Sequence, residues 1–221
     1  MNILAISSSC ETASAAALYN ENTLELKSVS PRGGHSQILM PLIDELLFKL
    51  GADMKAFDLI AVDIGPGSFT GVRIGVCAAN AIGLACKKPI LGISSLNALR
   101  YSLSEPKQGA ICSLIDCRNK NGYASLHMDG VCKIPESAVV IEDMLKGLPN
   151  DVTFVGNGAI MHRELVLDVL KRPIISDIDT VLSSSIIRAA LDTPSSEYRT
   201  EVFPMYLRPS QAERMKNAEK R

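Results

Sequence analysis

The chain has 221 residues, of which 47% are hydrophobic and 21% are charged, as in ordinary globular proteins. Its 23 basic and 24 acidic residues give a formal net charge of −1, which excludes a strong overall attraction to nucleic acid or to an anionic membrane. The six cysteines form no CxxC pair and only three histidines occur, so we expect free, reduced thiols in a cytoplasmic protein and no metal site. No basic leader and no long apolar run occurs, so we expect neither a signal peptide nor a membrane span.

The first half of the chain alternates signals for strands and helices. Apolar residues that recur with a period of 3.6 residues predict a helix over 37–50. Pro41 should delay the start of this helix or kink it, because proline has no backbone N–H to donate. The other predicted elements of this half are strands over 2–6, 13–19, 24–29, 58–63 and 89–93, and helices from the loop 65–71 to Cys86 and over 95–104.

The same pattern restarts in the second half, because a shift of 108 residues places Ile3 on Ile111 and Ile6 on Leu114. The predicted elements are strands over 111–115, 122–128, 131–134 and 152–155, helices over 138–147, 159–170 and 180–192, and a short final strand over 204–207. A duplicated βββαβα unit is the plan of the two-lobed, ribonuclease H-like folds of actin, Hsp70 and the sugar kinases. We expect lobes over 1–106 and 107–221, the second of which ends in a solvated basic tail after Pro209.

Two loops are candidates for chemistry. Ser7, Ser8 and Ser9 end the first strand, where hydroxyls and backbone amides either cradle an anion or form a polar hairpin turn. The acid that kinase-like members of this fold carry there is missing, because Ser7 occupies its place. The second loop follows the strand over 58–63 and opens a helix, so its glycines either allow close packing or help to bind an anion; its candidate residues are Gly65, Gly67, Ser68 and Thr70.

Other side chains give weaker signals. Ser68 has no base near it in sequence, so we predict no catalytic residue. Asp116 and Arg118 end a predicted strand as a potential polar pair, and Gly156-Asn157-Gly158 is either a second phosphate-type loop or a plain turn.

Two predicted helices offer a candidate partner surface. Small residues recur every four positions in the second one, which indicates that another backbone approaches closely, either that of the protein's own sheet or that of a partner helix. The first helix is apolar over more than one narrow stripe. The candidate interface consists of Leu39, Leu42, Ile43, Leu46, Gly71, Gly75, Ala79 and Gly83.

The chain resembles the TsaB (YeaZ) family over essentially its whole length. The segments that carry the resemblance are Ile3-Leu4-Ala5-Ile6 with Ser8-Ser9, His35-Ser36, Gly65-Pro66-Gly67-Ser68-Phe69-Thr70-Gly71 with Arg73-Ile74-Gly75, Gly92-Ile93-Ser94-Ser95-Leu96, and Tyr206-Leu207-Arg208. The resemblance implies a two-lobed, non-catalytic subunit of the bacterial complex that makes threonylcarbamoyladenosine in tRNA. The implied partners are a TsaD-like catalytic subunit, a TsaE-like ATPase and, through the complex, tRNA.

The related TsaD subunit carries an HxxxH metal pair in a similar segment, where this chain has Ser95 and Leu99. Leucine cannot bind a metal, so the resemblance implies a paralogue without metal or cofactor. Two other functions stay open from the sequence alone. One is a stand-alone enzyme, either a small-molecule kinase or a glycoprotease-like peptidase, against which the missing acid and the missing HxxxH pair both argue. The other is a free-standing homodimer.

Overall fold

The computed structural model describes residues 1–29 and 34–208, so the predicted basic tail lies outside the described residues. The first of its two sheets has the strand order β3-β2-β1-β4-β5. β1, β2 and β3 form an antiparallel meander, and β4 and β5 are parallel to β1. The strands are β1 (Ile3–Ser7), β2 (Thr12–Tyr19), β3 (Asn22–Val29), β4 (Leu59–Asp63) and β5 (Ile90–Ile93).

The second sheet repeats this plan in the order β10-β9-β6-β7-β8, with an antiparallel meander followed by two parallel strands. If the strands are numbered from one within each half and the second sheet is read from β8 to β10, both sheets have the strand order 3-2-1-4-5. The predicted duplicated, two-lobed α/β fold is therefore confirmed. The strands are β6 (Ala110–Asp116), β7 (Asn121–Met128), β8 (Val131–Val140), β9 (Thr153–Val155) and β10 (Ile174–Ile175).

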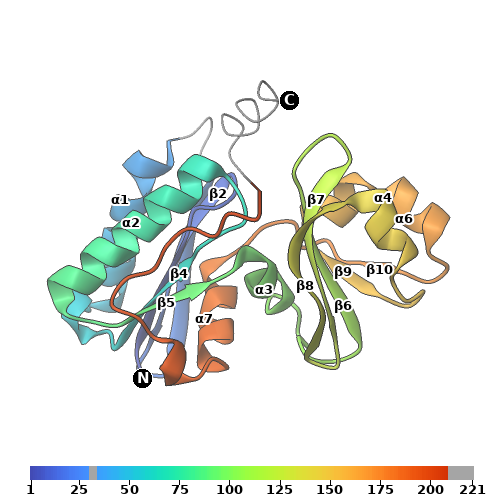
Figure 1. Cartoon of the computed structure of the whole chain (residues 1–221). Helices are drawn as coiled ribbons and strands as arrows, with labels where there is room; N and C mark the ends of the chain where they lie inside the picture. The colour runs from blue at the N-terminus through green and yellow to red at the C-terminus, as the bar shows by residue number, and fades with distance from the viewer. Residues whose placement is uncertain (30–33, 209–221) are drawn as a thin grey trace.

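The helices make three layers around the two sheets (Figure 1). α1 (His35–Leu50) and α2 (Phe69–Cys86) share one apolar cluster with the outer face of the first sheet. α4 (Ile141–Lys146), α5 (Asn157–Met161) and α6 (Arg163–Val169) lie on the outer side of the second sheet. α3 (Ser95–Arg100) and α7 (Ser183–Leu191) fill the space between the sheets.

The two middle helices cross between the lobes. α3 follows the first sheet in the chain but packs on β6 of the second, whereas α7 follows the second sheet and packs on β1, β2 and β4 of the first. Ile3 and Ala5 of β1 share a core with Ile186 and Ile187 of α7. The division at residue 106 therefore separates the two sheets, and as a domain boundary it stays a prediction.

Several predicted bounds are corrected. α1 begins at His35 with Pro41 inside it, so proline does not delay its start. Residues 135–140 continue β8, which shortens the predicted helix over 138–147 to α4. The predicted helix over 159–170 is interrupted at His162, which separates α5 from α6. α3 ends at Arg100, and β10 was not predicted.

The predicted strand over 204–207 is wrong, because that segment joins neither sheet. It runs extended, and Met205 N donates to Ile64 O at 2.7 Å. α2 meets, by length and composition, the requirement for a membrane-crossing helix, with a mean hydropathy of 1.5. It packs on β4 of the first sheet, and core helices of globular proteins meet the same requirement.

Candidate functional site

The loops after β1 and β4 lie against each other at one edge of the first sheet, because these strands are parallel neighbours that end together. Ser68 N donates to Ser9 O at 2.6 Å, and Ser8 Oγ donates to Gly71 O at 2.8 Å. Ser7, Ser8 and Ser9 are at most 4% exposed. Their hydroxyls are therefore engaged inside the protein, as expected for a packed polar turn.

The glycines of the second loop allow this contact. A Cβ at Gly71 would lie 1.9 Å from Ser8 O, and a Cβ at Gly67 would lie 2.4 Å from Ser9 O. Both distances are far below van der Waals contact, so a larger residue would push the two loops apart. The Ser68 hydroxyl accepts a hydrogen bond from Gly71 N and caps α2.

The acid that is missing from the end of β1 is supplied by β4. The Asp63 carboxylate is 1% exposed and accepts hydrogen bonds from Ser7 Oγ at 2.9 Å, Ser95 Oγ at 2.6 Å and Gly65 N at 2.9 Å. Ser9 Oγ donates to the same carboxylate. Four donors from β1, its loop, the loop after β4 and α3 thus converge on a single side chain.

Sequence reasoning missed Asp63, although a signal was present. The residue ends an apolar strand that is the parallel neighbour of β1, and parallel strands place their carboxyl ends at the same edge of a sheet. Burial raises the pKa of Asp63 above its ordinary value, and the four hydrogen bonds oppose that shift. Both carboxylate oxygens are occupied, so Asp63 organises the loops and offers no open position for a ligand.

The two positions of α3 that the resemblance compares with metal ligands both face inward. Ser95 bonds to Asp63, and Leu99 is 1% exposed in the core between the sheets. Among the side chains that the structure describes, which do not include that of His35, no three of His, Cys, Asp or Glu come close enough to hold a metal ion.

Polar side chains at the end of β6 pair differently from the prediction. Asp116 does not form a side-chain pair with Arg118; it accepts from the Arg118 backbone N–H at 3.0 Å and lies 2.8 Å from His162 Nε2. Asn157 Oδ1 accepts from Asp116 N at 2.9 Å, which ties the start of α5 to the end of β6. Gly156 and Gly158 both lie against Leu114, so these glycines make a close βα turn.

The predicted partner residues lie inside the protein, and this assignment is corrected. Every one of the eight is buried: Leu39, Leu42, Ile43, Leu46, Gly71, Gly75, Ala79 and Gly83. A Cβ at Gly75 would meet Ser8 Oγ at 2.8 Å, and one at Gly83 would meet the Ile90 side chain at 2.6 Å. The stripe of small residues thus serves the protein's own sheet and the loop after β1.

The opposite faces of α1 and α2 are exposed and partly apolar. Phe48 is 87% exposed, Leu84 is 81% exposed and Met40 is 41% exposed. Cys77 and Ala81 are also exposed on α2. The two helices contact each other and lie side by side on the outside of the first sheet (Figure 1). We call these five residues the α1–α2 face.

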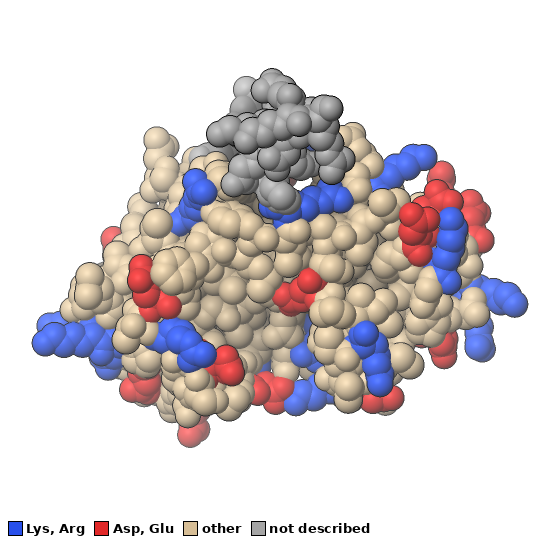
Figure 2. Space-filling model, in the orientation of Figure 1, with Lys and Arg blue, Asp and Glu red and all other residues tan. Residues whose placement is uncertain are grey.

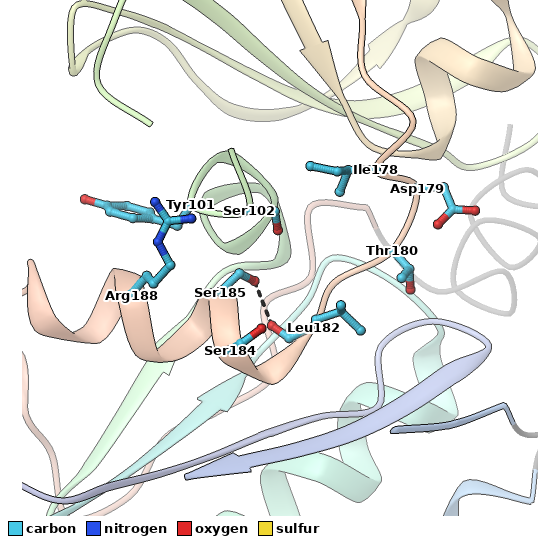
Figure 3. A pocket seen from close by; sticks show the side chains of 9 residues that line it. All are labelled: Tyr101, Ser102, Ile178, Asp179, Thr180, Leu182, Ser184, Ser185 and Arg188. Carbon is cyan, nitrogen blue, oxygen red and sulfur yellow. Dashed lines mark hydrogen bonds between the residues drawn. The ribbon is translucent and has the colours of Figure 1, made fainter. Parts of the chain in front are cut away.

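A cavity of ≈ 290 Å³ lies between the lobes, where the segment after β10 crosses to α7 (Figure 3). Its walls come from the end of α3, from 178–182 and from the first turns of α7, and most of its lining is apolar. Ser185 Oγ donates to Leu182 O at 2.7 Å, which holds the first turn of α7 against the residue that precedes it. Arg188, on the rim, donates to Ser104 O at 3.2 Å.

Comparisons with known proteins agree with this architecture. A family model described as "TsaD: tRNA N6-adenosine threonylcarbamoyltransferase" matches residues 29–200. The TsaB protein of Bacillus subtilis is 33% identical over 179 residues, which cover 77% of each chain. TsaB of Escherichia coli is 35% identical over 126 residues, covering 56% of this chain and 53% of that protein. The structure of YeaZ from Pseudomonas aeruginosa matches with a TM-score of 0.80 and 26% identity over 93% of this chain and 99% of that one.

The duplicated sheets define a two-lobed protein of the actin and sugar-kinase class. Within this class, the chain belongs to the TsaB family of tRNA threonylcarbamoyladenosine biosynthesis proteins, and the TsaD family model also matches this chain.

Proposed function

We propose that this protein takes part in the biosynthesis of threonylcarbamoyladenosine in tRNA as a non-catalytic subunit that binds a TsaD-like catalytic subunit. Membership of the TsaB family carries the proposal, since its relatives bear that name. The closed Asp63 cluster supports the non-catalytic role, because the residues that end β1 and β4 are hydrogen-bonded to each other.

The α1–α2 face is the proposed contact with the TsaD-like subunit. Two large apolar side chains that are more than four-fifths exposed, Phe48 and Leu84, lie on adjacent helices. Exposed apolar patches of this kind are typical of protein interfaces. The buried stripe on the other side of α2 holds that helix firmly against the sheet and so presents the face on a rigid support.

A TsaE-like ATPase joins the proposed complex, and tRNA binds to it through the other subunits. The charge pattern supports this indirect role, because basic and acidic side chains are interspersed on the visible face of the described residues (Figure 2). A cytoplasmic location belongs to the same proposal.

The proposal is tested by co-purification with a TsaD-like protein from the same cytoplasm. Leu84→Asp and Phe48→Asp should each abolish co-purification, because a charge in an apolar interface is costly, while leaving the fold intact because both sites are exposed. The matched control is Leu167→Asp on α6, which is 51% exposed and lies outside the α1–α2 face. Folded variants that retain the partner would refute this surface.

A complementation assay tests the role itself. In a bacterium depleted of its own TsaB, the chain should restore threonylcarbamoyladenosine in tRNA, measured by mass spectrometry of nucleosides. Unrestored tRNA together with ATP-dependent kinase or peptidase activity of the isolated chain would favour a stand-alone enzyme. A self-associated chain that ignores the TsaD-like protein would favour a homodimer.

A further inference from the structure

A larger cavity, of ≈ 540 Å³, runs along α3. Ser94, Asn97 and Arg100 line it at three-residue spacing, so they share one face of the helix. The facing wall is formed by β7 and β8 of the second lobe, and Met205 and Leu207 add an apolar side. Cavities of this volume accommodate small molecules.

Arg100 brings to this cavity a buried positive charge that forms no ion pair. The residue is 6% exposed, and no carboxylate within residues 1–29 and 34–208 forms an ion pair with it. Its guanidinium donates to Pro106 O and Asn97 Oδ1, both at 2.8 Å, and lies 4.6 Å from the centroid of the Tyr101 ring, while its Nε has no hydrogen-bond partner. Asp192 lies within electrostatic range but is already engaged by Lys107 and Tyr101. A buried cation without an ion pair is costly; the Tyr101 ring offsets part of that cost, and an anion bound beside the guanidinium would offset more of it.

His127 of β7 lines the cavity beside this charge. Its Nδ1 is buried without a hydrogen-bond partner, and burial together with the nearby Arg100 charge lowers the pKa of the imidazole. A neutral imidazole therefore has one N–H to offer. A buried donor without a partner is costly, so the proton belongs on the accessible Nε2. Asn97 adds its amide N–H₂, because its oxygen already accepts from Arg100.

The other end of the cavity has the opposite character. Glu136 of β8 accepts a hydrogen bond from Ser94 Oγ, and burial raises the pKa of its carboxyl. Asp63 lies close enough to contribute to that shift. A second anion is therefore disfavoured here, whereas ligand hydroxyl groups would find acceptors. About 9 Å of helix rise separates this end from Arg100.

We propose that this cavity binds a small hydroxylated organic anion, with its acid group at Arg100, Asn97 and His127 and its hydroxyl groups toward Glu136. A phosphate monoester and a carboxylate share the required chemistry, since both accept hydrogen bonds from a guanidinium. The proposal does not depend on the role in tRNA modification. In the alternative, Arg100 only pins the connection between the lobes through Pro106 O.

The proposal is tested on the full chain with four probes: glycerol 3-phosphate, glycerate, inorganic phosphate and glycerol. We expect millimolar glycerol 3-phosphate or glycerate to raise Tm and to shift the His127 imidazole resonances, and glycerol to do neither. A larger response to one of the two anions identifies the acid group. A response to inorganic phosphate as strong as to glycerol 3-phosphate would overturn the part assigned to Glu136.

Arg100→Met should weaken binding by at least about tenfold, because charge-assisted hydrogen bonds are lost. The matched control is Arg188→Met, which removes an arginine that also donates to the connection between the lobes but does not line this cavity. His127→Leu provides a second variant at a half-buried position if the first one unfolds. The proposal is overturned if no probe moves Tm or the imidazole resonances, or if the folded Arg100→Met or His127→Leu chain responds as the unchanged protein does.

Discussion

Replacing Asp63 by alanine should destabilise the protein strongly, because it removes the acceptor on which four donors converge. The donors from Ser7, Ser9 and Ser95 are almost fully buried, so water cannot easily replace the carboxylate. A buried donor left without a partner costs about 1–3 kcal/mol. Hydroxyl rotation relieves some of this cost, and we therefore expect a loss of about 3–5 kcal/mol in the free energy of unfolding. That loss is a large share of the total for a domain of this size.

Urea denaturation followed by circular dichroism measures this loss. Asp63→Asn is the isosteric comparison: its oxygen can accept from Gly65 N and Ser95, and its amide can donate to the hydroxyl oxygens of Ser7 and Ser9. We expect it to retain stability to within about 1 kcal/mol. Asp44→Ala, on the exposed face of α1, should change stability by at most about 0.5 kcal/mol. An Asp63→Ala chain that loses less than about 1 kcal/mol would refute the convergence argument.

The pH dependence of stability gives a second measurement on Asp63. Its folded-state pKa lies above the ordinary value of 3.8, so the folded protein holds this proton more tightly than the unfolded chain does. The contribution of the Asp63 proton to the free energy of unfolding is fully present below pH 3.8. It is lost as pH rises through the folded-state pKa. Asp63→Asn should therefore gain stability relative to the unchanged protein as pH rises from 3.8. A difference independent of pH would contradict the raised pKa.

Three further outcomes follow from the packing. Gly71→Ala should unfold or strongly destabilise the chain by denaturant titration, because its Cβ would lie 1.9 Å from a backbone oxygen. A fragment covering 1–106 should show no cooperative unfolding by calorimetry, because it lacks α7 over one face of its sheet; a cooperative transition would contradict this. Titration of the freshly prepared, denatured protein should find six free thiols, and in the native state exposed Cys77 and Cys132 should react faster than buried Cys112. Four thiols or fewer, or the reverse order of rates, would be inconsistent with the structure.

Local signals predicted most of the secondary structure because these elements are long enough to show their period. Short apolar runs bounded by turn residues were enough to predict β1, β2 and β3, and an apolar period of 3.6 residues was enough to predict α1. The signals failed where they were short or mixed. Residues 138–140 read as the start of a helix, yet pairing with β7 keeps them in β8. β10 has only two residues, too few for any period.

The loops and the partner surface show a different limit. The sequence showed that small residues recur on α2 and predicted that another backbone approaches them closely. The same pattern is expected whether that backbone belongs to the protein's own sheet or to a helix of a partner. Only the packing decides that Gly71, Gly75 and Gly83 meet Ser8 and Ile90. The apolar residues left exposed on α1 and α2 then follow by elimination.

The order of elements and the duplication could thus be inferred from the chain itself, because hydrophobic period and turn residues act over a few neighbours. The family was inferred from the resemblance of short segments such as residues 65–71. The tertiary structure alone decided which distant groups meet. It brought the Asp63 carboxylate to the hydroxyls of β1 and α3, carried α7 back to the first sheet, and enclosed Arg100 without a counter-ion. Each of these depends on burial between segments far apart in sequence, and burial determines whether a polar group is satisfied, charged or available to a ligand.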